Sequence, residues 1–294
     1  MLANVEQFSR FELLAHQVVE GFITGLHRSP MHGFSVEFAE HRLYNNGEST
    51  RHIDWKLYGK TDKLFVKRYE EETNMRCYIV IDVSNSMAFE NKLRFACQAA
   101  ACLSYLIAKQ RDVVGLTVFS DHIEEQTELK SSVAHQKHLF SRLEYYADRK
   151  SLPIKETDTD RNAAALLHLI AEQTHKRSMV IIFSDMFDHV KQLDDLFGAL
   201  QHLRYKQNEV LLFHTMAYNK ELAFDYGHYG HRFIDVETGE TLKVYPQDVK
   251  AQYSDTVQSF IKTLKARSKQ YGIQYVDANV DETYSKILHT FLYS

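Results

Sequence analysis

A short apolar run that ends in alternating oxygen-bearing side chains restricts most strongly how this chain can fold. Residues 79–81 are Ile-Val-Ile, and Asp82, Ser84 and Ser86 follow at alternate positions. A run of this kind is typical of a buried parallel strand, and a helical pattern begins near residue 91. We therefore expect three oxygen donors in a strand-to-helix loop at the carboxyl edge of a sheet, where open α/β folds bind their ligands.

The donor types favour a hard cation. Carboxylate and hydroxyl oxygens suit Mg²⁺, Mn²⁺ or Ca²⁺ better than zinc. Two later segments offer matching partners: Thr159 lies just before an alanine-rich helical pattern, and Asp185 follows the apolar run 179–183. The spacing of the first loop alone is weak support for a metal site, and the two later segments strengthen it.

From residue 76 onward the pattern alternates between strands and helices. Strands are predicted at 77–82, 113–119, 178–184, 209–215 and 273–276. Helices are predicted at 91–110, 134–147, 162–175, 189–205, 248–270 and 281–292. Such alternation predicts an α/β fold with a mostly parallel sheet and helices on both faces.

The expected domain division lies near residue 75. Residues 1–75 hold an amphipathic helix at about 8–26 and then a segment of period-two patterning, which predicts a small β-rich unit. Residues 76–294 form the α/β domain. Within it, the turn Glu237-Thr-Gly-Glu240 predicts a hairpin insertion at about 217–247.

Composition excludes several classes of protein. The 294 residues are 44% hydrophobic and 25% charged with a net charge of −4, which gives no broad electrostatic case for nucleic acid. The three cysteines have no metal or redox spacing and are typical of a reduced, cytosolic protein. We expect a cytoplasmic protein with no integral membrane segment, because no apolar stretch is long enough to span a bilayer and no signal peptide is evident.

The three segments together resemble the metal-ion-dependent adhesion site of von Willebrand factor A domains. In that family the two serines and the threonine bind the metal directly, while the aspartates act largely through water. The resemblance implies that Ser84, Ser86 and Thr159 are direct ligands of Mg²⁺ (or Mn²⁺ or Ca²⁺), supported by Asp82 and Asp185. It also implies a von Willebrand A-like fold and an open coordination position for a partner's carboxylate.

The N-terminal part narrows the resemblance. The stretches 42–56 (Arg-Leu-Tyr-Asn-Asn-Gly-Glu-Ser-Thr-Arg-His-Ile-Asp-Trp-Lys) and 64–72 (Leu-Phe-Val-Lys-Arg-Tyr-Glu-Glu-Glu) resemble the bacterial domain-of-unknown-function family numbered fifty-eight. The resemblance covers roughly residues 30–290. Family genes commonly lie beside MoxR-type AAA+ ATPases, which implies a cytoplasmic adaptor with such an ATPase or its client as partner. Many members carry N-terminal membrane helices, and no such segment is evident in this sequence.

Simpler interpretations stay open for several residues. Asp82, Ser84 and Ser86 are residue types that also cap helices. Trp55, the lone tryptophan, favours a buried anchor over a binding residue. The sixteen histidines lack the cysteine or Glu-x-x-His context of a zinc site and are interpreted as ordinary surface residues.

Three functions compete. The first is a binding scaffold in which the Asp82 loop holds Mg²⁺ and recruits an acidic residue of a partner. The second is a Mg²⁺-dependent hydrolase or phosphatase with Asp82 as nucleophile, although Ser84 stands where such enzymes place the general acid. The sequence also contains no phosphate-binding loop and no Gly-x-Ser-x-Gly elbow. The third is a regulatory module whose metal site fills in one conformation only.

Overall fold

The alternating pattern forms a six-stranded sheet with the order β10-β7-β6-β3-β4-β5. The strands are β3 (Arg76–Asp82), β4 (Val113–Phe119), β5 (Ile123–Gln126), β6 (Met179–Ser184), β7 (Glu209–Met216) and β10 (Gln274–Asn279). All neighbours pair in parallel except β4 and β5, which are antiparallel. The predicted α/β class and mostly parallel sheet are therefore confirmed.

This computed structural model describes residues 9–28, 41–44, 55–67, 75–149, 163–187, 193–235 and 239–293. They belong to two compact units, one comprising residues 1–23 and 75–294 and the other residues 24–74.

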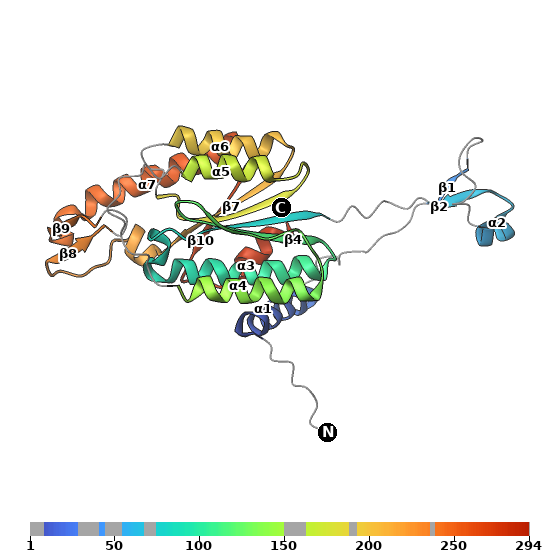
Figure 1. Ribbon diagram of the computed structural model, residues 1–294, viewed down its shortest axis with the longest axis horizontal. Helices are drawn as coiled ribbons and strands as arrows, with labels where there is room; N and C mark the ends of the chain where they lie inside the picture. Colours follow the sequence, from blue (N-terminus) through green and yellow to red (C-terminus); the bar gives the residue numbers. More distant parts are fainter. Residues whose placement is uncertain are drawn as a thin grey trace, which may run out of the picture. The chain divides into compact units, whose positions relative to one another are not determined.

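Helices cover both faces of the sheet in the larger unit (Figure 1). On one face lie α3 (Lys92–Lys109), α4 (Val133–Ala147) and α8 (Ser285–Leu292). On the other lie α5 (Ala163–Gln173), α6 (Leu193–Tyr205) and α7 (Pro246–Gln270). Each face of the sheet forms a hydrophobic cluster with the helices that cover it, as expected for buried strands.

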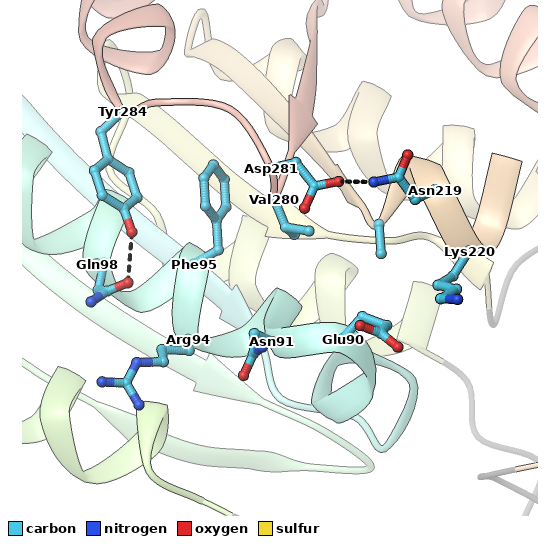
Figure 2. A pocket seen from close by; sticks show the side chains of 11 residues that line it. Glu90, Asn91, Arg94, Phe95, Gln98, Asn219, Lys220, Val280, Asp281 and Tyr284 are labelled. Carbon is cyan, nitrogen blue, oxygen red and sulfur yellow. Dashed lines mark hydrogen bonds between the residues drawn. The ribbon is translucent and has the colours of Figure 1, made fainter. Parts of the chain in front are cut away.

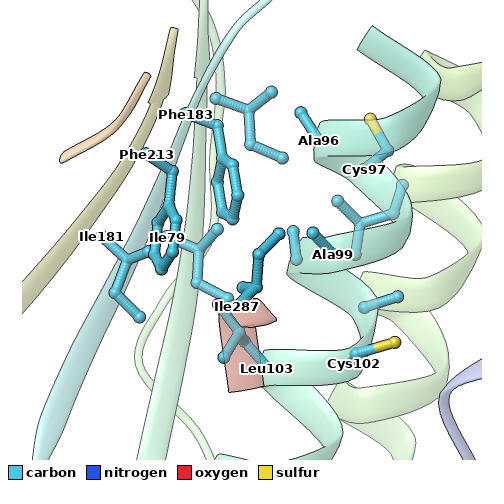
Figure 3. Close-up of a cluster of buried hydrophobic side chains, with 14 of the residues drawn as sticks. Ile79, Ala96, Cys97, Ala99, Cys102, Leu103, Ile181, Phe183, Phe213 and Ile287 are labelled. Atoms are coloured by element: carbon cyan, nitrogen blue, oxygen red, sulfur yellow. The ribbon is translucent and has the colours of Figure 1, made fainter. Parts of the chain in front are cut away.

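Small residues let α3 pack closely on the sheet. Figure 3 shows Ala96 and Ala99 of this helix facing the apolar side chains of the central strands, among them Phe183 and Phe213. Those two rings stack with centroids 4.9 Å apart. Because α3 is held this tightly, its first residue, Lys92, has a fixed position at the carboxyl edge of the sheet.

The helix α1 (Arg10–Arg28) adds a further layer on the α3 and α4 side (Figure 1). Phe11, Ala15 and Val19 recur at helical spacing and are at most 2% exposed within the same cluster as α3 and α4. A hydrogen bond from the Phe11 backbone N–H to Glu144 Oε1, at 2.6 Å, ties its first turn to α4. Thus residues 10–23 of α1 belong to the larger unit.

The order in which strands are added to the sheet changes side between β3 and β6. From β3 the chain builds outward through β4 and β5, and then returns to the other side of β3 with β6, β7 and β10. At such a switch point the connections after the two neighbouring strands lead to opposite sides, which leaves a crevice at the carboxyl ends of these strands. Asp82 ends β3, and Ser184 ends β6 with Asp185 directly after it.

The hairpin insertion is formed by β8 (His231–Ile234) and β9 (Thr241–Val244), which pair antiparallel. It follows η4 (Tyr218–Leu222), a short π-helical turn after β7, and leads into α7. The predicted hairpin is confirmed for its two strands, and residues 236–238 of its turn lie outside the described residues.

The smaller unit, which was expected to be β-rich, also contains a helix. Its described residues form the antiparallel pair β1 (His41–Leu43) and β2 (Phe65–Lys67), together with the helix α2 (Trp55–Thr61). Trp55 and Tyr58 lie three residues apart on that helix with their rings edge to face at 6.2 Å, a spacing that the period-two interpretation missed. Trp55 is 62% exposed, so its interpretation as a buried anchor is wrong.

None of the helices within the described part of the chain is both long and apolar enough to span a membrane.

Candidate metal site and the adjoining cavities

The carboxylate of Asp82 joins the carboxyl ends of the neighbouring strands β3 and β6. Its Oδ1 accepts a hydrogen bond from the Ser84 backbone N–H at 2.9 Å, and its Oδ2 accepts one from the Ser184 hydroxyl at 2.6 Å. Asp82 is only 6% exposed. These bonds fix the loop after β3 against the end of β6, which places the predicted residues of both strands in one site.

The hydroxyls of Ser84 and Ser86 lie side by side, with their Oγ atoms 3.0 Å apart. Ser86 also hydrogen-bonds to the carboxylate of Asp185, across the gap between the two strands. The structure therefore brings together Asp82, Ser84, Ser86 and Asp185, while Thr159 lies outside the described residues. Helix capping does not explain this grouping, because α3 begins only at Lys92 and its N-cap position is Asn91.

The sequence interpretation missed Lys92. Its side chain is 1% exposed, and its ammonium lies 2.6 Å from Asp185 Oδ2 and 2.5 Å from Glu221 Oε1. Burial lowers the pKa of Lys92, but the two carboxylates outweigh burial and hold that pKa above its ordinary value. Lys92 is therefore a permanent buried cation that serves two carboxylates at once.

Those two carboxylates respond differently. Burial raises the pKa of Asp185, yet Lys92, the Phe187 backbone N–H and the Ser86 hydroxyl more than offset this and lower the pKa overall. Burial dominates at Glu221 and raises its pKa, with Lys92 lowering it only in part. Asp185 is thus firmly ionised, and Glu221 is the carboxylate that most readily takes a proton.

The carboxylate of Glu221 is held by its own turn. Its Oε2 accepts a hydrogen bond from the Ala217 backbone N–H at 2.7 Å, at the junction of β7 and η4. Glu221 lies in a π-helical turn 129 residues beyond Lys92, so no local pattern marked it as a partner. Only its position on a short turn after a buried strand, like that of Asp82 and Asp185, was a usable signal.

A buried histidine on β7, the strand next to β6, contacts the backbone just after β6. His214 Nε2 lies 2.8 Å from the carbonyl oxygen of Asp185, and His214 Nδ1 lies 2.6 Å from the hydroxyl of Tyr275. Burial lowers the pKa of His214 to about 4. The ring is therefore neutral at neutral pH and donates from Nε2 to the carbonyl oxygen of Asp185, while the Tyr275 hydroxyl also bonds to Asp277 Oδ1 at 3.1 Å.

The donor set fits a hard divalent cation. Two hydroxyl oxygens lie 3.0 Å apart, Ser86 bonds to the carboxylate of Asp185, and each carboxylate oxygen of Asp82 can accept more than the one bond described for it. Among the described residues no three His, Cys, Asp or Glu side chains gather closely enough to hold a metal by themselves. A cation here would therefore depend on the serine hydroxyls.

Ser86 also lines a cavity of about 580 Å³ that opens beside the site. The cavity lies between η2 (Ser86–Asn91), the end of β6, η4, β8 and α7. Six of its lining residues are aromatic: Phe89, Phe187, Tyr226, Phe233, Tyr253 and Phe260. Three charged residues also line it: Lys92, Glu221 and Asp235. We call it the aromatic cavity.

A second cavity, of about 500 Å³, lies beyond the ends of β7 and β10 (Figure 2). Arg94 and Lys220 balance Glu90 and Asp281 around it, so it carries no excess of either charge. Hydrogen bonds within its wall join Tyr284 to Gln98 at 2.6 Å and Asn219 to Asp281 at 2.9 Å. None of the four predicted site residues described in the structure lines it.

Comparison with known proteins yields uncharacterized relatives. A protein from Mycobacterium bovis and one from Mycobacterium tuberculosis are each 21% identical over 189 residues, covering 63% of this chain and 58% of the relative. The chain thus spans less than two thirds of the length of these curated relatives.

Solved structures provide two distant likenesses. An aerotolerance-related membrane protein from Bacteroides fragilis matches with a TM-score of 0.45 and 15% identity, over 74% of this chain and 97% of its own. The protein BatB from Bacteroides thetaiotaomicron matches with a TM-score of 0.41 and 15% identity, over 75% of this chain and 100% of the BatB chain. At TM-scores below 0.5, neither likeness identifies a fold or function for this chain.

A family model covers most of the sequence. It is described as "Protein of unknown function DUF58" and matches residues 40–260, which include the smaller unit's described strands, the candidate metal site and the hairpin. This chain therefore belongs to the DUF58 family of proteins of unknown function.

Proposed function

We propose that the protein is a metal-dependent binding adaptor whose larger unit is a von Willebrand A-like domain. In this proposal the hydroxyls of Ser84, Ser86 and Thr159 bind Mg²⁺, or Mn²⁺ or Ca²⁺ in its place, and Asp82 and Asp185 support it. When bound, the cation supplies a hard Lewis acid with an open position for a carboxylate. That carboxylate belongs to a protein partner, for which the resemblance suggests a MoxR-type AAA+ ATPase or its client.

The charge of the buried cluster is the observation that best supports this proposal. Asp185 and Glu221 are at most 6% exposed and share the ammonium of Lys92, and Asp82, also 6% exposed, ends the neighbouring strand β3. Two carboxylates against one ammonium leave an excess of one negative charge when both carboxylates are ionised. His214 does not reduce this excess, because it is neutral above its lowered pKa of about 4.

An unbalanced buried charge is costly in free energy, because the protein interior solvates ions poorly. A divalent cation at the paired hydroxyls of Ser84 and Ser86 would offset this excess negative charge. In the absence of such a cation, protonation of Glu221 would remove the excess charge most easily, because burial raises the pKa of Glu221. The cluster therefore favours a divalent cation over a neutral ligand.

The arrangement supports a hydrolase less well. Both carboxylate oxygens of Asp82 accept hydrogen bonds, and the residue is 6% exposed, so it is poorly placed to attack a substrate. Ser84, two residues on, cannot serve as a general acid. Lys92 is committed to two carboxylates and offers no free base.

Partner capture from the protein's own host tests the adaptor function. Tagged wild type, Ser84→Ala/Ser86→Ala and the control Ser120→Ala are compared with Mg²⁺ and with chelator. Ser120 follows β4, the neighbouring strand, and its hydroxyl bonds to Glu124 at 2.7 Å, outside the site. A partner held by wild type and Ser120→Ala only with Mg²⁺, and lost in the double variant, supports the proposal. If the amount of captured partner changes neither with chelator nor in the double variant, the proposal is contradicted.

A substrate screen separates the adaptor from the hydrolase. Wild type and Asp82→Asn are assayed against phosphate monoesters and other hydrolase substrates with Mg²⁺. We expect no turnover in either protein. Robust Mg²⁺-dependent turnover that disappears in Asp82→Asn would replace the adaptor with an enzyme.

A further inference from the structure

The ammonium of Lys92 is held at the candidate metal site from several sides. It lies 2.6 Å from Asp185 Oδ2 and 2.5 Å from Glu221 Oε1. Its nitrogen also lies 5.2 Å from the centroid of the Phe187 ring and 5.9 Å from that of Phe89, within the range of cation–π attraction. Two carboxylates and two rings therefore fix a positive charge against a carboxylate that the sequence assigns to the metal site.

The carboxylate of Asp185 has little accepting capacity left. Its Oδ2 accepts a hydrogen bond from Lys92, its Oδ1 accepts one from the Phe187 backbone N–H at 3.1 Å, and the Ser86 hydroxyl bonds to the same carboxylate. A carboxylate offers about four lone-pair positions in all. A divalent cation at the serine hydroxyls would therefore share the negative charge of Asp185 with an ammonium that already contacts it.

Glu221 gives the same ammonium a second counter-charge. Its Oε1 accepts a hydrogen bond from Lys92, and its Oε2 accepts one from the Ala217 backbone N–H at 2.7 Å. Within the part of the chain that the structure describes, no hydrogen bond joins Glu221 to the serines of the site or to Asp185. Lys92 can therefore release Asp185 and stay paired, whereas an unpaired buried ammonium would be costly.

We propose that Lys92 is a resident counter-cation that competes with the divalent cation for the carboxylate of Asp185. This inference rests on the proposed function and deepens it, because it states how binding at that site is regulated. Two cations drawn to one carboxylate repel each other, so the ammonium lowers the affinity of the site for the metal. The ammonium also neutralises Asp185 when no metal is bound, so the larger unit folds with or without one.

This competition gives a physical basis for a metal site that fills under particular conditions only. When a divalent cation binds, either Lys92 moves away from Asp185 toward Glu221, or the two cations remain close and repel each other. Both outcomes reduce the affinity for the metal. A partner's carboxylate on the metal would add negative charge and offset that loss, which fits an adaptor that binds metal and partner together.

Two variants separate competition from net charge. Lys92→Met removes the ammonium, while Lys92→Met/Glu221→Gln removes the ammonium and one carboxylate together. Wild type has two carboxylates and one ammonium in this cluster, and the double variant has Asp185 alone, so the ionised cluster has the same net charge in both. Lys109→Met is the control for the loss of a lysine, because its ion pair with Glu20 is solvent-exposed.

Calorimetric titration of each full chain with Mg²⁺ and Mn²⁺ measures the affinity, and circular dichroism establishes that each variant is folded. We expect the double variant to bind several-fold more tightly than wild type, and Lys92→Met about tenfold more tightly or better. Glu221→Gln leaves the ammonium to Asp185 alone and should bind more weakly than wild type. Lys109→Met should bind as wild type does, because its charge is exposed and screened by salt.

Equal or weaker binding by the folded double variant would overturn the competition and leave the metal site standing, because wild type would still bind through its serines. If neither lysine variant folds, Glu221→Gln decides, and an affinity equal to or above that of wild type would overturn the proposal. Addition of Ser84→Ala/Ser86→Ala to the double variant should abolish binding, which shows that the gain occurs at the proposed site. A gain that survives these serine changes would overturn the proposal, and no binding by any of the proteins would contradict the metal site and the competition together.

Discussion

Lys92 Nζ lies 2.6 Å from Asp185 Oδ2, so an ammonium occupies one side of the carboxylate that the sequence assigns to a metal site. The same ammonium bonds to Glu221, which gives it a second anchor. A lysine placed in this way keeps Asp185 ionised in the absence of any other cation, and it holds the ends of β6 and η4 against the start of α3.

Removal of this ammonium should destabilise the fold. Lys92→Met leaves Asp185 and Glu221 as neighbouring buried carboxylates without a counter-charge, which should cost about 3 kcal/mol or more. Urea denaturation gives the difference in the free energy of unfolding. Lys109→Met is the matched control, because its pair with Glu20 is solvent-exposed and should contribute less than about 1 kcal/mol.

A second substitution should restore part of the loss. In Lys92→Met/Glu221→Gln, a neutral amide replaces one of the two carboxylates that lost their counter-charge, so the double variant should be more stable than Lys92→Met alone. Equal stability of the single and double variants would show that the cost lies in packing rather than in charge.

The helix α1 should be required by the larger unit. Val19 lies on the buried face of α1 and is 0% exposed, so Val19→Asp buries a charge and should lower the free energy of unfolding by several kcal/mol. Leu13 on the same helix is 56% exposed, and Leu13→Asp should change stability by less than about 0.5 kcal/mol. Thermal melting of the two variants distinguishes them; similar melting temperatures would mean that α1 contributes nothing to the core.

His214 should make stability depend on pH. Burial lowers its pKa from 6.5 to about 4, so between these values the unfolded chain binds a proton that the folded protein does not. Stability from this residue is complete above about pH 6.5 and falls as the pH drops toward 4, by at most about 3 kcal/mol. Urea denaturation across this range should show a steeper loss for wild type than for His214→Gln. Parallel curves would exclude a buried, neutral histidine.

The central strands follow from local pattern, because β3 and β6 are short apolar runs with a polar residue at their carboxyl ends. Asp82 and Asp185 are therefore predicted from sequence alone, whereas the bond between Ser184 and Asp82 that joins the two strand ends is not. The edge strand β5 was missed, since its sequence Ile-Glu-Glu-Gln has one apolar residue and is only partly buried. Its pairing with β4, rather than its own pattern, makes it a strand.

The lysine and glutamate of the site could not be found in this way. Lys92 begins an amphipathic helix, where a lysine is ordinarily solvated, and its partners lie 93 and 129 residues away in the sequence. The aromatic cavity is similarly non-local, because its rings come from η2, the end of β6, η4, β8 and α7. Tertiary contacts of this kind leave no spacing to detect in a single sequence.

Calorimetric titration with Mg²⁺ and Mn²⁺ tests the central claim most directly, because the claim is that the paired hydroxyls of Ser84 and Ser86 hold a divalent cation. Wild type and the control Ser120→Ala should bind one ion per chain with modest affinity, since several of the direct ligands are neutral hydroxyls. Ser84→Ala/Ser86→Ala should show no binding while it retains the wild-type circular dichroism spectrum. Undiminished binding in that folded double variant, or no binding by wild type, would contradict the account.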